Sequence, residues 1–127
     1  MEMDKEQALH EFWSSFGLTA YDENTVPDNA MTANGGKYLT YNVATAALDE
    51  PTPLYANLWY KSSSWAEITQ KANEMAESIG LVGSFTDYDG GTLWITRGRP
   101  FKQRMPDEDD TIRRIYINVM AEYMSAD

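Results

Sequence analysis

Cysteine is absent from this chain of 127 residues. Disulfides and thiolate chemistry are therefore excluded, together with the thiol ligands of the common structural zinc sites. The single histidine, His10, falls inside a predicted helix and has no second histidine to help complete a set of three or four zinc ligands. We therefore expect His10 to have a structural role, and we expect no metal site.

Long apolar runs are also missing, since no stretch approaches the ~20 apolar residues of a membrane span. The charged start, Met-Glu-Met-Asp-Lys-Glu, is unlike a signal peptide. The composition, 43% hydrophobic and 24% charged, is that of an ordinary globular protein. We expect one domain over residues 1–127 that is intracellular and does not bind a membrane.

The motifs of several enzyme classes are not present. The sequence has no G-x-S-x-G elbow, no G-x-x-x-x-G-K-[ST] loop and no G-x-G-x-x-G loop. The acidic run Asp107–Asp110 lacks the alternating ligands and central glycine of a calcium loop. We therefore expect no catalytic residues and no cofactor. A hydrolase with paired carboxylates stays open, because acidic side chains are plentiful.

Basic residues are scarce, with 10 Lys and Arg against 20 Asp and Glu and a net charge of −10. Six of the ten lie between Arg97 and Arg114, where the acidic run interrupts them. An acidic protein binds nucleic acid poorly, because phosphate contacts need positive local potential. Phe101 is the only aromatic residue interleaved with the basic stretch, whereas single-strand binders use several. We expect no specific nucleic-acid partner.

Two helices are predicted, over Asp4–Phe16 and Ser64–Ile79. In the first, Asp4 is the expected cap with Gln7 three residues on, and the apolar residues fall on one face. In the second, Ser64-x-x-Glu67 has the pattern of a capping box. The apolar faces consist of Leu9, Phe12, Trp13 and Phe16, and of Trp65, Ile68, Ala72, Met75, Ala76 and Ile79.

Strands are predicted at Leu18–Tyr21, Tyr38–Val43, Leu54–Lys61, Leu81–Thr86, Thr92–Arg97 and Ile112–Met124. The turn residues of Asp87–Gly91 indicate a hairpin, and Asp22–Gly36 and Ala44–Pro53 are expected to be irregular. In the last strand, Ile115, Ile117, Val119, Ala121 and Tyr123 share one face. The order α-β-β-β-α-β-β-β predicts an α+β fold with two helices packed on one mostly antiparallel sheet.

The basic stretch is the candidate site. We predict an oligomer or partner interface formed by Arg97, Arg99, Phe101, Lys102, Arg104, Arg113 and Arg114. Identical acidic copies that present a basic edge to an acidic face would form a head-to-tail contact, which closes into a ring if the rotation fits. The 4 Trp, 8 Tyr and 4 Phe would supply its apolar anchor. Replacing Arg97, Arg99 and Arg104 by Glu is then expected to weaken self-association. The plainer alternative is an exposed hairpin connection whose charges are solvated and pair internally.

Three stretches resemble a known family. They are LWYKSSSWAEI at 58–68, WITRGRPFKQRMPD at 94–107 and IRRIYINV at 112–119. Together they resemble the tail-terminator and tail-to-head joining (tail-completion) proteins of long-tailed phages and prophages of Gram-positive bacteria, over about residues 54–120. The resemblance includes no catalytic motif, which agrees with a structural protein rather than an enzyme.

That resemblance implies a hexameric ring at the head-proximal end of the tail, which stops tail-tube polymerisation and joins the tail to the head. The implied partners are copies of the chain itself, the tail-tube protein and the head connector protein. Assembly would take place in the cytoplasm of the bacterial host, and the product would be part of the virion. The alternatives are another head–tail connector or minor tail component, and a small carboxylate-based enzyme or ligand-binding domain with a deep pocket and convergent acids.

Overall fold

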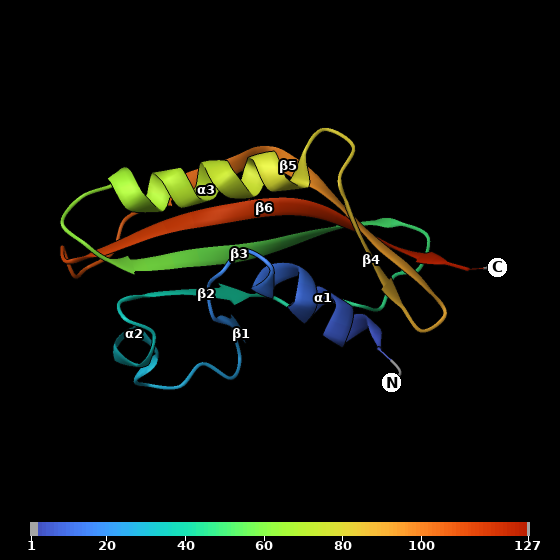
Figure 1. Cartoon of the computed structure of the whole chain (residues 1–127), viewed down its shortest axis with the longest axis horizontal. Coiled ribbons are helices and arrows are strands. Elements are labelled where there is room, and N and C mark those ends of the chain that lie inside the picture. The colour runs from blue at the N-terminus through green and yellow to red at the C-terminus, as the bar shows by residue number, and fades with distance from the viewer. Residues whose placement is uncertain (1–2, 127) are drawn as a thin grey trace.

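The computed structural model describes residues 3–126 and contains one six-stranded sheet in the order β1-β2-β3-β6-β5-β4. Neighbouring strands are antiparallel except for the parallel pair β1 and β2. In chain order the elements are α1 (Lys5–Ser14), β1 (Ala20–Asp22), α2 (Ala30–Ala33), β2 (Lys37–Tyr41), β3 (Pro51–Lys61), α3 (Ala66–Ile79), β4 (Ser84–Tyr88), β5 (Gly91–Met105) and β6 (Ile112–Ser125). Helices α1 and α3 lie on the same face of the sheet (Figure 1). The predicted α+β class and element order are confirmed, with α2 as a short addition inside the expected irregular loop.

The first helix begins as its sequence predicts. The Asp4 carboxylate accepts a hydrogen bond from the Gln7 backbone N–H at 2.8 Å, and the Gln7 side chain accepts one from the Asp4 N–H at 2.9 Å. This reciprocal pair is a capping box, which satisfies two donors that the first helical turn leaves free. The helix ends at Ser14 rather than at Phe16, which is half-buried against the core.

The second predicted helix, α3, starts at Ala66, and its expected capping box does not form. The Ser64 hydroxyl accepts from the Ala66 N–H at 3.1 Å, and Trp65 occupies the cap position. Because Ala66 is the first residue of the helix, this hydrogen bond belongs to the turn before α3 and does not cap it. The apolar face is confirmed for Ile68, Ala72, Met75 and Ile79, whose side chains are buried, whereas Trp65 and Ala76 of the predicted face are half-buried.

Strand β3 begins at Pro51, inside the stretch expected to be irregular up to Pro53. The Tyr55 N–H donates to the Asn42 side chain at 2.7 Å, so it points toward the β2 side. Strand alternation places the nitrogens of Pro51 and Pro53 on that same side, where β2 pairs with β3 only from Ala56 onward. The two prolines therefore remove no hydrogen bond from the ladder, and the strand can include them.

The predicted hairpin is confirmed as β4 and β5, and it has a tighter turn than expected. Tyr88 pairs with Gly91, so Asp89 and Gly90 form the connection, and Gly90 has a φ of 99°. A Cβ on Gly91 would lie 2.0 Å from the Met124 carbonyl oxygen. Only glycine allows the backbones of β5 and β6 to approach this closely.

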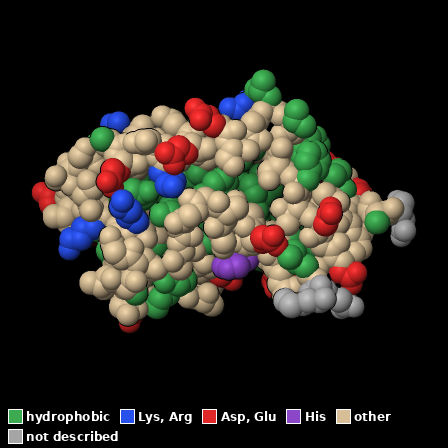
Figure 2. Space-filling model, viewed as in Figure 1, with side chains coloured by type: hydrophobic (Ala, Val, Ile, Leu, Met, Phe, Trp, Pro, Cys, Tyr) green, Lys and Arg blue, Asp and Glu red, His purple; other side chains and the backbone are tan. Residues whose placement is uncertain are grey.

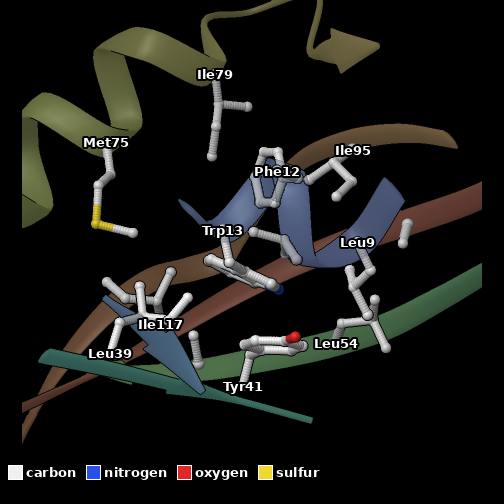
Figure 3. Close-up of a cluster of buried hydrophobic side chains, with 14 of the residues drawn as sticks. Leu9, Phe12, Trp13, Leu39, Tyr41, Leu54, Met75, Ile79, Ile95 and Ile117 are labelled. Carbon is white, nitrogen blue, oxygen red and sulfur yellow. The ribbon is translucent and has the colours of Figure 1, made fainter. Parts of the chain in front are cut away.

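The core lies between the sheet and the two longer helices (Figure 3). Trp13 is fully buried, with its ring 4.8 Å from that of Phe12 and 6.4 Å from that of Tyr41. The predicted inner face of the last strand is confirmed, since Ile115, Ile117, Val119, Ala121 and Tyr123 are all buried. One continuous core therefore holds α1, α3 and the sheet together.

Tyr123 is a weak point of this core. Its side chain is buried, and its hydroxyl has no hydrogen-bond partner among residues 3–126. We expect Tyr123→Phe to raise the free energy of unfolding by about 1 kcal/mol, because it removes an unsatisfied buried polar group and keeps the ring. Urea unfolding at pH 7 measures the change. A loss of stability of similar size would show that the hydroxyl is satisfied.

The same substitution has a signature at high pH. Burial raises the pKa of Tyr123 from 10.0 to about 12, so the folded state keeps the hydroxyl neutral where the unfolded chain ionises. The stability from this group is therefore complete below pH 10 and is lost as pH rises toward 12. Between pH 10 and 12 we expect the free energy of unfolding of Tyr123→Phe to fall less steeply than that of the wild type. Part of the fall should remain in the variant, because burial also raises the pKa of Tyr60 to about 12.

Candidate functional site

The basic stretch from Arg97 to Met105 belongs to strand β5, which contains a four-residue bulge. Arg97 pairs with Val119 and Lys102 with Ile117, so the four residues Gly98–Phe101 stand opposite the single residue Asn118. The Asn118 side chain donates to the Pro100 carbonyl at 3.2 Å, and Phe101 packs against the core. The predicted strand end at Arg97 is therefore wrong, because the ladder resumes after the bulge and continues to Met105.

Gly98 permits this bulge to lie close to β6. A Cβ at this position would lie 2.7 Å from the Asn118 Cβ and 2.8 Å from its backbone. We expect Gly98→Ala to lower the free energy of unfolding by about 1–3 kcal/mol. The added methyl group would overlap Asn118, which can move away only if the backbone of β6 shifts. Arg99→Ala, an exposed position in the same bulge, should change it by no more than about 0.5 kcal/mol. Urea unfolding compares the two, and equal values would show that the bulge tolerates a side chain at Gly98.

Three of the predicted residues lie on the helix side of the sheet. The guanidinium groups of Arg104 and Arg113 lie 4.7 and 5.4 Å from the centre of the Trp65 ring. Arg113 also donates to the carbonyls of Ser63 and Asp110, at 3.0 and 2.9 Å. Lys102 donates to the Asn73 side chain. These cations therefore help to hold α3 and the turn beside it in place.

Arg114 points to the opposite side of the sheet, which we call the open face. Its guanidinium lies 5.0 Å from the centre of the Trp59 ring, and its Nε donates to the Asn57 side chain at 2.9 Å. Adjacent residues of a strand face opposite ways, so Arg113 and Arg114 cannot share a patch. The structure thus divides the predicted residues among the helix side, the open face and the region of the bulge, where Arg97 is the last paired residue and Arg99 and Phe101 lie within the bulge. Their part in an interface stays a prediction.

The acidic run forms the turn between β5 and β6. The Asp109 carboxylate accepts from the Thr111 N–H at 2.8 Å and from its hydroxyl at 2.6 Å, and these hydrogen bonds lower the pKa of Asp109. Within residues 3–126 the ion pairs are Lys37 with Glu67 and Lys71 with Glu74, at 3.0 and 3.4 Å. Neither pair involves the stretch 97–114, so the alternative of internal charge pairing is not what the described residues show.

A second feature lies beside the bulge and was not predicted. Leu81, Val82 and Phe85 are 91%, 73% and 55% exposed, although they are large apolar side chains. The Trp94 indole N–H donates to the Val82 carbonyl at 2.8 Å, and the Phe85 and Trp94 rings stack at 6.0 Å. We call the exposed residues Leu81, Val82 and Phe85, with Arg97 and Arg99, the edge patch. Figure 2 shows hydrophobic side chains gathered where the α3–β4 loop and β4 lie.

The edge patch borders a surface hollow of about 490 Å³. Its lining consists of Gly80, Leu81, Thr96, Arg97, Gly98, Arg99 and Phe101. Leu81 and Val82 were predicted to lie in a strand, whereas they form a loop before β4. The glycines on either side, Gly80 and Gly83, indicate a loop in the sequence, and both have positive φ angles in the structure.

The open face is rich in aromatic side chains. Tyr38 and Trp59 stack at 6.2 Å, and Tyr55 and Tyr116 at 5.4 Å. The Trp59 indole N–H donates to the Thr40 hydroxyl at 3.0 Å, so the aromatic layer covers polar groups of the sheet. Outward positions of an exposed sheet are normally polar, which makes this face a second candidate for contact with another protein.

Two hollows contain pairs of carboxylates, as the enzyme alternative requires. One, of about 210 Å³, includes Glu67 and Glu74, and each of these acids pairs with a lysine. The other, of about 410 Å³, includes Asp89 and Asp4, and Asp4 caps α1. Three of the four carboxylates therefore have structural contacts.

The remaining chemical candidates have structural contacts as well. The ring nitrogens of His10 lie 3.0 Å from the Tyr41 hydroxyl and 3.3 Å from the Ser14 hydroxyl.

No group of three or more potential metal ligands converges anywhere in the described part of the chain. Across residues 3–126, none of the helices is both long and apolar enough to span a membrane.

Comparison with known proteins identifies the fold. No protein-family model matches the chain, and no curated protein matches it. A chain from the virion of a native gene transfer agent particle superposes with a TM-score of 0.63 at 18% identity, covering 94% of this chain and 93% of that one. Another solved structure, of a protein without a descriptive name, superposes with a TM-score of 0.59 at 15% identity over 93% and 89%. This chain therefore has, over nearly its whole length, the fold of a virion protein.

Proposed function

We propose that this chain is a structural protein of a phage-like virion. The observation that carries the proposal is the fold shared with a gene transfer agent virion chain over 94% of the present sequence. The surface supports it, because the edge patch and the aromatic open face offer extended contact areas. Large apolar surface of this kind is typical of proteins that assemble.

Within that class, we propose a subunit of a tail-terminator or tail-to-head joining ring. The resemblance of residues 58–68, 94–107 and 112–119 to tail-completion proteins supports this assignment. In this role the chain would cap the tail tube and dock it to the head connector, as a ring of about six copies. The net charge of −10 suits a passage for DNA, since like charges prevent the DNA from adhering.

The alternative within the same class is another head–tail connector or a minor tail component. The fold supports both roles equally, and they differ in the partner that is bound. A ring terminator binds the end of the tail tube, whereas a connector protein binds the head side without affecting tube length. A tail-tube gene directly after the gene for this chain would favour the terminator.

Tube capping tests the proposal. The purified chain, labelled with gold through a terminal tag, is mixed with polymerising tail-tube protein encoded in the same genome, and the tubes are examined by negative-stain microscopy. We expect label at one tube end only, and shorter tubes as the chain is added. Binding to the head connector without binding to tubes would favour the alternative. Binding to neither would overturn the proposed role.

A further inference from the structure

We propose that the edge patch of one copy docks on the β1 edge of the next copy. By the β1 edge we mean Asp22, Glu23 and Asp28, with Val26 and Pro27 between them. This inference rests on the proposed ring, and it names the two surfaces that would build it. Both surfaces follow from the order of the strands and from the distribution of charge.

The two surfaces lie at opposite ends of the sheet. The strand order β1-β2-β3-β6-β5-β4 makes β1 one edge, and β4 with the bulged part of β5 the other. In Figure 1 the α3–β4 loop and the segment around β1 and α2 project from opposite sides of the molecule. A contact between different edges is heterologous, so it repeats from copy to copy and closes into a ring when the rotation fits.

The edge patch has the properties of a rigid anchor. Leu81 and Val82 are 91% and 73% exposed, and the hydrogen bond from Trp94 to the Val82 carbonyl fixes their loop. Exposed apolar side chains that are already held in place lose little conformational freedom on binding. Arg97 and Arg99 line the same hollow as Leu81, and neither makes an ion pair within residues 3–126.

The β1 edge is complementary in charge. Asp22, Glu23 and Asp28 are the only charged residues between Glu11 and Lys37 in the sequence, and none of them is in an ion pair within residues 3–126. The Glu23 carboxylate accepts from the Tyr55 hydroxyl, a contact that leaves its charge in place. Glu23 and Asp28 are exposed, and Pro27 between them is an exposed apolar side chain. Arginines next to exposed apolar side chains, set against acids next to exposed apolar side chains, are complementary in charge. In so acidic a protein, this is where two copies attract rather than repel.

Cross-linking tests the contact directly, because the chain has no native cysteine. Val82→Cys is mixed with a tagged Asn29→Cys chain, which keeps all three acids of the β1 edge, and treated with a short bis-maleimide, and the products are separated by mass on a denaturing gel. The matched control is Val82→Cys mixed with tagged Ser78→Cys, an exposed and uncharged position on α3. We expect the first mixture to give at least about tenfold more mixed dimer than the control, because docking raises the local concentration of the two thiols.

Two outcomes would overturn the inference. Equal yields in both mixtures would show that the named edges do not meet. A dominant Val82→Cys homodimer would show a symmetric contact of the edge patch with itself. Negative-stain images of the same samples before cross-linking separate the two claims. Rings that form without the mixed dimer would contradict the contact between these two edges but agree with the proposed function. Failure to cap tail tubes would contradict the proposed function, whatever the cross-linking result.

Discussion

Replacing Trp13 with alanine is expected to lower the free energy of unfolding by about 3–5 kcal/mol. Trp13 is fully buried and contacts Phe12 and Tyr41, so it joins α1 to the sheet. The cavity cannot collapse easily, because β2 is held in the sheet by its pairing with β3. A loss of this size is a large part of the 5–15 kcal/mol typical of a domain, so the variant should be partly unfolded at 37 °C.

Trp13→Phe is the matched control for this prediction. The indole N–H of Trp13 is buried and has no hydrogen-bond partner among the described residues. Phenylalanine removes that unsatisfied group and keeps most of the aromatic contact, so we expect a loss of only about 1–2 kcal/mol. Urea unfolding followed by circular dichroism measures both variants. Similar small losses for both would mean that α1 contributes little to the core.

The second large effect concerns association. Arg97→Glu combined with Arg99→Glu is expected to raise the dissociation constant for self-association by at least about tenfold at low salt, while the monomer stays folded. The two arginines are the positive charges of the edge patch, and their reversal places acids opposite acids. Arg104, which the sequence grouped with them, contacts Trp65, so its replacement would also disturb the fold. Sedimentation velocity at several salt concentrations measures the effect.

Two comparisons make this result specific. Lys37→Glu combined with Lys61→Glu changes the net charge by the same amount away from the edge patch, and should leave association within about threefold of the wild type. Mixing the Arg97/Arg99 variant with a Glu23→Lys/Asp28→Lys chain should restore mixed association, because the charges are exchanged across the contact. Equal weakening by both double variants would show that only net charge matters.

Local chemistry explains most of the fold that the sequence predicts. The capping box at Asp4 and Gln7 and the alternation of β6 depend on residues near in sequence, and both are confirmed. Two errors depend on longer-range effects. Pro51 and Pro53 fit into β3 because β2 does not reach them on the side to which their nitrogens point, while β6 pairs with them on the other side. The ladder of β5 continues past Arg97 because Asn118 accommodates the bulge.

The candidate site was predictable in part. The concentration of cations near Arg97 is visible in the sequence, and so is the surplus of aromatic residues. The sequence does not show that these cations point to different sides of the sheet, because this depends on the side that each strand residue faces. It also does not show that Arg104 and Arg113 contact Trp65. The exposure of Leu81 and Val82 was not predictable from hydropathy, because apolar residues are normally taken as buried.

The mass of the assembled protein tests the proposed ring most directly. Multi-angle light scattering across a wide concentration range, with negative-stain images of the same samples, determines whether copies of the chain close on themselves. We expect a closed ring of about six copies whose formation weakens as salt increases. A strict monomer of 14.4 kDa at every concentration, which also leaves tail tubes uncapped, would contradict it.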